Sequence, residues 1–143
     1  MSRRTSREFA LQGLFQIDVA KADVREAIEH VLEQEGAEID PVFVRDLVNG
    51  TTKHVDKIDA VLSKHTIGWD LKRMANVDRN VLRMAVYEML FHEETPTSVV
   101  LDEAIDMAKA FSTPDSGKFV NGVLAKIVPE MDGLRGEFAA AQE

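Results

Sequence analysis

The chain has 143 residues, of which 45% are hydrophobic and 29% charged, values typical of one globular domain. It contains no cysteine, which excludes a disulfide framework and a thiolate metal site. The N-terminus lacks the apolar segment of a signal peptide, and no apolar run approaches the roughly 18 residues of a membrane span. We therefore expect a soluble cytoplasmic protein that forms a single domain over residues 1–143 and binds neither a cofactor nor a membrane.

The net charge of −8 argues against a surface that binds nucleic acid everywhere, because phosphates are bound by Lys and Arg. The charges are unevenly placed, however. Residues 2–7 contain Arg3, Arg4 and Arg7 and no acidic residue, whereas residues 23–46 are mainly acidic. A local binding site for RNA is therefore compatible with the overall negative charge.

Helical periodicity of the apolar residues recurs along the chain, and the alternation typical of strands is nearly absent. A capping-box pattern at residues 5–8 predicts that the first helix begins near Ser6. A second, short helix is predicted over Val24–Leu32. Asp40, followed by a proline, should cap the longest helix, which we predict over residues 41–64.

The C-terminal half of the chain is also predicted to be helical. Further helices are expected at residues 69–74, 77–90, 99–111 and 117–128. The segment 77–90 is apolar on most sides, which is typical of a helix at the centre of the core. Pro129 should end the last core helix, so residues 129–143 are expected to form a weak helix or a frayed C-terminal tail.

Motifs for enzymatic chemistry are incomplete. Gly117 and Lys118 lack the upstream glycine of a phosphate-binding loop, and His92 lacks the second histidine of an HExxH zinc site. The adjacent carboxylates of Asp102 and Glu103 would project about 100° apart on a helix and would not converge on one substrate. We therefore expect a protein that is not an enzyme and has no metal site.

Three basic features lie where helix stability alone does not favour them. Arginines at a helix N-terminus are disfavoured by about 0.3–1 kcal/mol each, but an RNA phosphate would make that position favourable. Arg79, Arg83 and Tyr87 form a strip along the central helix that suits phosphate contact and base stacking, unless Arg83 is paired with an acid. Lys118 lies at the start of the last core helix beside Phe119, for which core packing and base stacking both remain open.

Four blocks of the sequence together resemble the NusB family of transcription antitermination factors. They are RRxxRExALQxLF at 3–15, VDRxVLRxAxYE at 77–88, DEAIxxAKxF at 102–111 and DSxKFVNGVL at 115–124. The blocks occur in the family's order and cover nearly the whole predicted core. The resemblance is specific because it rests on all four blocks, since the first block alone would be weak.

The resemblance implies an all-α fold of about seven helices in two packed bundles. It also implies binding of boxA RNA jointly with NusE, a ribosomal protein, and action on RNA polymerase with other Nus factors to suppress termination, mainly in ribosomal RNA operons. The RNA contacts that it implies are Arg3, Arg4, Arg7, Phe15, Arg83, Lys118 and Phe119. The implied NusE contact is Asp78, and Phe15 stands where many members have tyrosine, so stacking is retained without the hydroxyl.

Two alternatives remain open, a helical protein-interaction module without RNA binding and a stand-alone relative of the RNA-binding domain of an rRNA methyltransferase. The N-terminal arginines argue against the first, and the lack of a Gly-rich cofactor loop argues against an active methyltransferase. If the arginines bind RNA, their replacement by alanine should leave the folding stability unchanged or slightly higher. Asp78 should then matter for the NusE contact and little for RNA.

Overall fold

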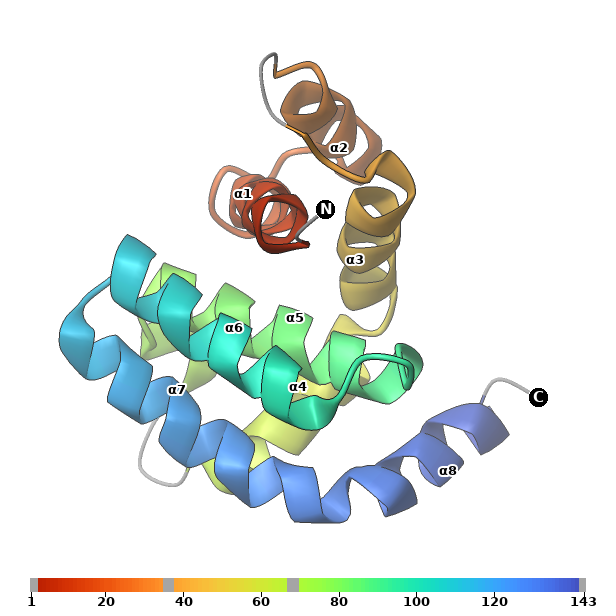
Figure 1. Cartoon of the computed structure of the whole chain (residues 1–143), viewed down its shortest axis with the longest axis vertical. Coiled ribbons are helices and arrows are strands. Elements are labelled where there is room, and N and C mark those ends of the chain that lie inside the picture. The colour runs from red at the N-terminus through yellow and green to blue at the C-terminus, as the bar shows by residue number, and fades with distance from the viewer. Residues whose placement is uncertain (1–2, 35–37, 67–69, 142–143) are drawn as a thin grey trace.

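The computed structural model describes residues 3–34, 38–66 and 70–141, and within these ranges it contains helices and no strand (Figure 1). The helices are α1 Arg4–Val19, α2 Val24–Leu32, α3 Pro41–Lys53, α4 Val55–His65, α5 Asn76–Phe91, α6 Thr97–Phe111, α7 Pro114–Ile127 and α8 Met131–Ala141, with short 3-10 turns at Leu71–Arg73 and Val128–Glu130. None of the described helices is long and apolar enough to cross a membrane. The prediction of an all-α fold is confirmed, although residue 69 of the predicted connecting helix lies outside the described residues.

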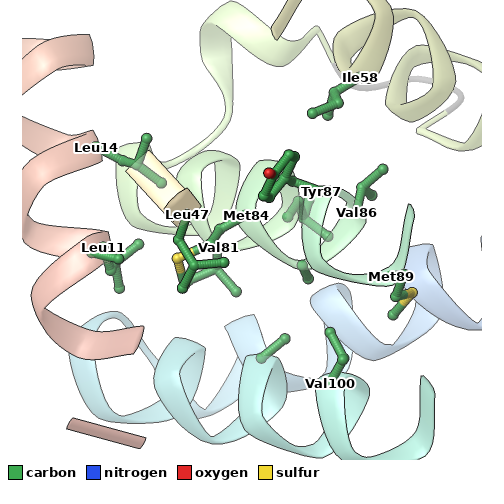
Figure 2. Close-up of a cluster of buried hydrophobic side chains, with 14 of the residues drawn as sticks. Leu11, Leu14, Leu47, Ile58, Val81, Met84, Val86, Tyr87, Met89 and Val100 are labelled. Carbon is green, nitrogen blue, oxygen red and sulfur yellow. The ribbon is translucent and has the colours of Figure 1, made fainter. Parts of the chain in front are cut away.

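Helix α5 lies at the centre of the molecule, as its apolar sequence predicts. Helices α1 to α3 form one group, helices α4 to α8 form the other, and α5 packs against both (Figure 1). Side chains from both groups meet α5 in one core, in which Leu47, Ile58 and Met84 are fully buried (Figure 2). Each large aliphatic side chain buried in this way contributes roughly 1.5–3 kcal/mol to the folding free energy.

Helix α1 begins at Arg4, two residues before the predicted start, and has no side-chain cap, so the predicted capping box at residues 5–8 is wrong. Ser6 lies inside the helix, where its hydroxyl accepts a hydrogen bond from the backbone N–H of Asp40 at 2.9 Å. The hydroxyl thus serves a distant donor and not the N–H groups of its own first turn. It ties α1 to the start of α3.

The predicted helix at 41–64 is two helices, α3 and α4, which meet at His54. The backbone of His54 leaves the helical region, and its ring stacks on Phe91 of α5 with the ring centroids 4.7 Å apart. One turn earlier, a Cβ atom added at Gly50 would lie 2.0 Å from the Cζ atom of Tyr87. The glycine that weakens the helical pattern therefore makes room for the tyrosine ring.

In the described residues, the segment after Pro129 forms a packed helix, the first of the two predicted alternatives, and residues 142–143 of the predicted tail lie outside the described residues. Pro129 lies in a short 3-10 turn, and α8 follows it directly. Leu134 and Phe138 of α8 are buried, and the Arg135 guanidinium donates two hydrogen bonds to the carbonyl oxygen of Met89, at 2.8 and 3.0 Å. These contacts fasten α8 to the C-terminal end of α5.

Candidate nucleic-acid and partner interface

Arg7 lies inside the protein and not on the predicted RNA surface. Its side chain donates to both carboxylate oxygens of Glu88 on α5, at 2.8 and 2.6 Å. Arg7 is 4% exposed and Glu88 is 1% exposed, so this two-bonded pair is closed to a phosphate from outside. Replacing Arg7 would leave Glu88 buried without its partner, which contradicts the expectation of unchanged stability.

The other two N-terminal arginines lie nearer to the surface. Arg4 is partly buried and donates to Glu103 and Asp106 of α6, at 3.0 and 2.9 Å. Arg3 is exposed, and its guanidinium carbon lies 4.1 Å from the centre of the Phe43 ring, a cation–π contact. The three arginines therefore differ in their access to an outside anion, and Arg3 is the most accessible of them.

The arginines of the predicted basic strip on α5 are paired with acidic side chains of neighbouring helices. Arg79 donates two hydrogen bonds to Asp18 of α1, at 2.6 and 2.9 Å. Arg83 donates two to Asp59 of α4, at 2.7 and 2.8 Å, and Tyr87 is 5% exposed. The alternative in which Arg83 is paired with an acid is therefore the one that the structure shows, and the strip joins α5 to α1 and α4.

Asp46 of α3 links Tyr87 to His92 at the C-terminal end of α5. The Tyr87 hydroxyl donates to Asp46 at 2.9 Å, and burial together with this hydrogen bond raises the pKa of Tyr87 above its usual value. His92 bonds both Asp46 and Glu94, the latter at 2.8 Å. Burial acts to lower the pKa of His92, but the hydrogen bonds to these two acids outweigh it and raise the pKa.

The raised pKa of His92 predicts a pH-dependent contribution to stability. Its ion pairs stabilise the fold fully below the pKa of the unfolded chain, and this stabilisation is lost as the pH rises through the folded pKa. We expect His92→Gln to lower the melting temperature more at about pH 5 than at about pH 9, as measured by thermal unfolding.

His54 provides the opposite control, because burial lowers its pKa, with help from the nearby Lys53 and Lys57. Protonation of His54 therefore opposes folding as the pH falls. Relative to the wild type, His54→Gln should raise the melting temperature more, or lower it less, at about pH 5 than at about pH 9. If His92→Gln instead lowers the melting temperature equally at both pH values, the ion pair between His92 and Asp46 is not formed in solution.

An apolar groove of about 310 Å³ lies where α1, α5 and α6 meet. Leu11, Phe15, Val77 and Phe111 supply its apolar lining, and Phe15 and Phe111 are 39% and 48% exposed. Phe111 lies at the end of a predicted helix, and nothing in the local sequence distinguishes it from a core residue. Two exposed phenylalanines in one groove indicate an interaction site.

Helix α7 begins at Pro114 and not at Gly117 as predicted. Its N-cap is Thr113, whose hydroxyl oxygen accepts a hydrogen bond from the backbone N–H of Ser116 at 3.2 Å. Asp115 therefore lies in the first turn and does not cap the helix. The proline occupies the first helical position, where a missing N–H has no consequence.

Asp78, the predicted partner contact, is only 7% exposed. It lies in the first turn of α5, where a negative charge is favoured by the helix dipole. The Ser116 hydroxyl donates a hydrogen bond to one of its carboxylate oxygens at 3.1 Å. The carboxylate is thus directed toward α7 and away from solvent.

Lys118 is exposed near the start of α7, and Phe119 beside it is half-buried against the core. A second lysine, Lys109 of α6, lies at the same corner. A Cβ atom added at Gly117 would lie 2.7 Å from the Cγ atom of Lys109, so the glycine lets the lysine stem lie across α7. The position of Lys109 could not be predicted from the sequence, because it depends on how closely α6 and α7 approach.

The predicted RNA residues therefore do not form one continuous patch. In the chain, Lys118 and Phe119 follow the corner between α6 and α7. The groove that contains Phe15 is also lined by Phe111, which ends α6 before that corner. Arg3 precedes α1, so most of the helix separates it from Phe15. Among the residues that the structure describes, no cluster of His, Cys, Asp or Glu could hold a metal ion.

Comparison with known proteins agrees with this fold and with the four sequence blocks. Residues 4–129 match the model of the NusB family. The transcription antitermination protein NusB of Bacillus subtilis (strain 168) is 50% identical over 132 residues, which cover 92% of this chain and 98% of that protein. A solved structure of T. maritima NusB has a TM-score of 0.86 and 35% identity, and covers 96% of this chain and 98% of its own.

A further solved structure contains the antitermination factors NusB and NusE in complex with double-stranded RNA. One of its chains is similar to this protein with a TM-score of 0.79 and 28% identity, over 87% of this chain and 94% of that chain. Sequence and structure agree over most of the length, and the chain belongs to the NusB family.

Proposed function

We propose that this protein is a transcription antitermination factor that binds boxA-type RNA together with NusE. The complex then acts in the cytoplasm on RNA polymerase, with other Nus factors, to suppress termination in ribosomal RNA operons. The observation that carries the proposal is the pairing of an exposed basic corner, at Lys109 and Lys118, with an adjacent apolar groove. A similar chain has been solved with both a NusE protein and RNA, and no catalytic step is part of the proposal.

The RNA surface that we propose consists of the exposed basic residues and one ring. Lys118 and Lys109 would contact phosphates, and the half-buried Phe119 would stack on a base. Arg3 extends the surface at the start of α1, and Arg4, shared with two carboxylates, lies at its margin. These contacts suit single-stranded RNA, whose bases are free to stack.

Arg7 and Arg83 have a different role in this proposal, because their guanidinium groups are already bound to carboxylates. A phosphate would have to displace a buried or partly buried carboxylate from each, which would leave that acid without its partner. We therefore assign both arginines to positioning. Arg7 holds α1 on α5, and Arg83 holds α5 on α4.

The apolar groove is the proposed docking site for an apolar segment of NusE. Among the described residues, its lining includes Glu8 and no lysine or arginine, so an RNA phosphate would meet a negative charge there. Phe15 and Phe111 are exposed at its rim and would be covered by a protein partner. This assignment moves Phe15 from the RNA contacts to the partner contacts.

The proposal predicts that Arg3→Ala with Lys118→Ala weakens RNA binding and lowers its salt dependence. Each lost phosphate contact should reduce the slope of log affinity against log salt by about 0.7 for single-stranded RNA. The measurement is titration of labelled boxA RNA at several salt concentrations, with and without NusE. We expect tighter RNA binding when NusE is present.

Two control variants separate the surfaces. Lys64→Ala removes an exposed lysine on α4 and should leave both bindings unchanged. Phe15→Ala should weaken NusE binding and leave RNA binding by the protein alone unchanged. An unaltered salt slope in the double variant would contradict the RNA surface. Equal RNA affinity with and without NusE would instead indicate a self-sufficient RNA-binding domain.

A further inference from the structure

Asp78 does not present its carboxylate at the surface, although the resemblance to the family implies a partner contact there. Its side chain is buried, and its Oδ2 atom accepts a hydrogen bond from the Ser116 hydroxyl. Its Oδ1 atom is also buried and makes no hydrogen bond within the described residues. Asp78 therefore contributes through the residues whose position its carboxylate fixes.

Three hydroxyl groups meet at the corner between α6 and α7. The Ser116 oxygen lies 2.9 Å from that of Ser112 and 3.1 Å from that of Thr113. A hydroxyl has one proton and two acceptor positions, and an ionised carboxylate only accepts. The Ser116 hydroxyl donates to Asp78, and the hydroxyl oxygens of Ser112 and Thr113 lie within hydrogen-bond distance of the same Ser116 oxygen. Through Ser116, the carboxylate of Asp78 is connected to the hydroxyl groups at the end of α6 and at the start of α7.

This network borders both of the proposed surfaces. On one side, Val77 and Phe111 of the apolar groove directly precede Asp78 and Ser112 in the chain. On the other side, Ser116 is followed after one glycine by the RNA-facing Lys118. The hydrogen bonds of this network therefore connect the groove to the start of α7.

We propose that Asp78 and Ser116 are positioning residues for RNA binding, and that NusE in the groove tightens RNA binding through their hydrogen bond. This inference rests on the function proposed above. The hydrogen bond fixes the first turn of α7 against α5, and so fixes where Lys118 points. A partner that covers the groove restricts the motion of the corner between α6 and α7. RNA binding then loses less conformational entropy when it orders this corner. By linkage, RNA must strengthen NusE binding by the same factor.

The test is RNA binding by Ser116→Ala, first without NusE. Loss of one hydrogen bond should weaken the binding by roughly 3- to 10-fold. Ser98→Ala, which changes an exposed serine at the start of α6, is the matched control and should bind as the wild type does. Asp78→Asn keeps the shape of the side chain and should show a smaller loss, even if Ser116→Ala is poorly folded.

A double-mutant cycle separates positioning from simple stability. If Ser116 acts through Lys118, then adding Ser116→Ala to Lys118→Ala should weaken RNA binding by less than it does in the wild type. The ratio of RNA affinities with and without NusE should also fall toward one. A lower melting temperature with both the affinity and this ratio unchanged would overturn the inference.

The outcomes also distinguish the inference from the proposed function. If the wild-type protein fails to bind boxA RNA both with and without NusE, the proposed function is wrong. If the wild type binds cooperatively and the Ser116→Ala and Asp78→Asn variants do the same, the function stands and the positioning role is wrong.

Discussion

Glu88→Ala should lower the free energy of unfolding by about 3–5 kcal/mol, because it would leave the Arg7 guanidinium buried without its carboxylate. The pair is bound through two hydrogen bonds of 2.8 and 2.6 Å, and both side chains are almost completely buried. The measurement is urea-induced unfolding, followed by circular dichroism and by fluorescence. The two signals should give the same midpoint if the protein unfolds in two states.

Two further variants test whether burial causes this loss. Arg7→Met combined with Glu88→Leu should recover most of the stability, since replacing both charges leaves neither of them unpaired. Arg45→Ala breaks an exposed pair with Glu29, at 3.2 Å, and should cost no more than about 1 kcal/mol. If Glu88→Ala costs no more than Arg45→Ala, the buried pair does not stabilise the fold.

Gly50→Ala is expected to destabilise the protein by about 3 kcal/mol, at the upper end of the range for overpacked cores. The new Cβ atom would lie 2.0 Å from the Cζ atom of Tyr87. The ring cannot easily move, because its hydroxyl is bonded to Asp46 and its face stacks on Phe91 with the ring centroids 4.9 Å apart. Thermal and urea unfolding would measure the loss.

Gly122→Ala is the matched control, since a Cβ atom at Gly122 of α7 would meet nothing within 4 Å. Alanine is the better helix former by roughly 1 kcal/mol, so this variant should be as stable as the wild type or more so. Combining Gly50→Ala with Tyr87→Ala should cost less than the sum of the two changes. Strict additivity would show that the tyrosine ring is not the obstacle.

The apolar periodicity predicts most of the fold because each helix has to bury one face. Val24–Leu32 forms α2 with the predicted bounds, and the central place of α5 follows from a sequence that is apolar on most sides. The break at His54 was not predictable in this way. The apolar positions keep their spacing through it, and its backbone conformation accompanies ring stacking on Phe91, far along the chain.

The candidate site was predicted less completely, because helix-dipole arguments consider only neighbours along the chain. The acid that binds Arg7 is Glu88, which lies 81 positions away in the sequence. Lys118 is exposed, so for that residue the local argument and the structure agree. The exposure of Phe111 likewise depends on how α1, α5 and α6 pack.

Helix α8 covers one side of the Phe91 ring, so the kind of side chain that suits position 91 depends on whether α8 is present. Phe138 packs edge-on against Phe91, with the ring centroids 6.0 Å apart, and Arg135 covers the neighbouring carbonyl oxygen of Met89. In a family member that lacks α8, a phenylalanine at position 91 would face water on that side. Selection should then favour a more polar side chain there, so that the residue at position 91 and the presence of α8 coevolve across the family.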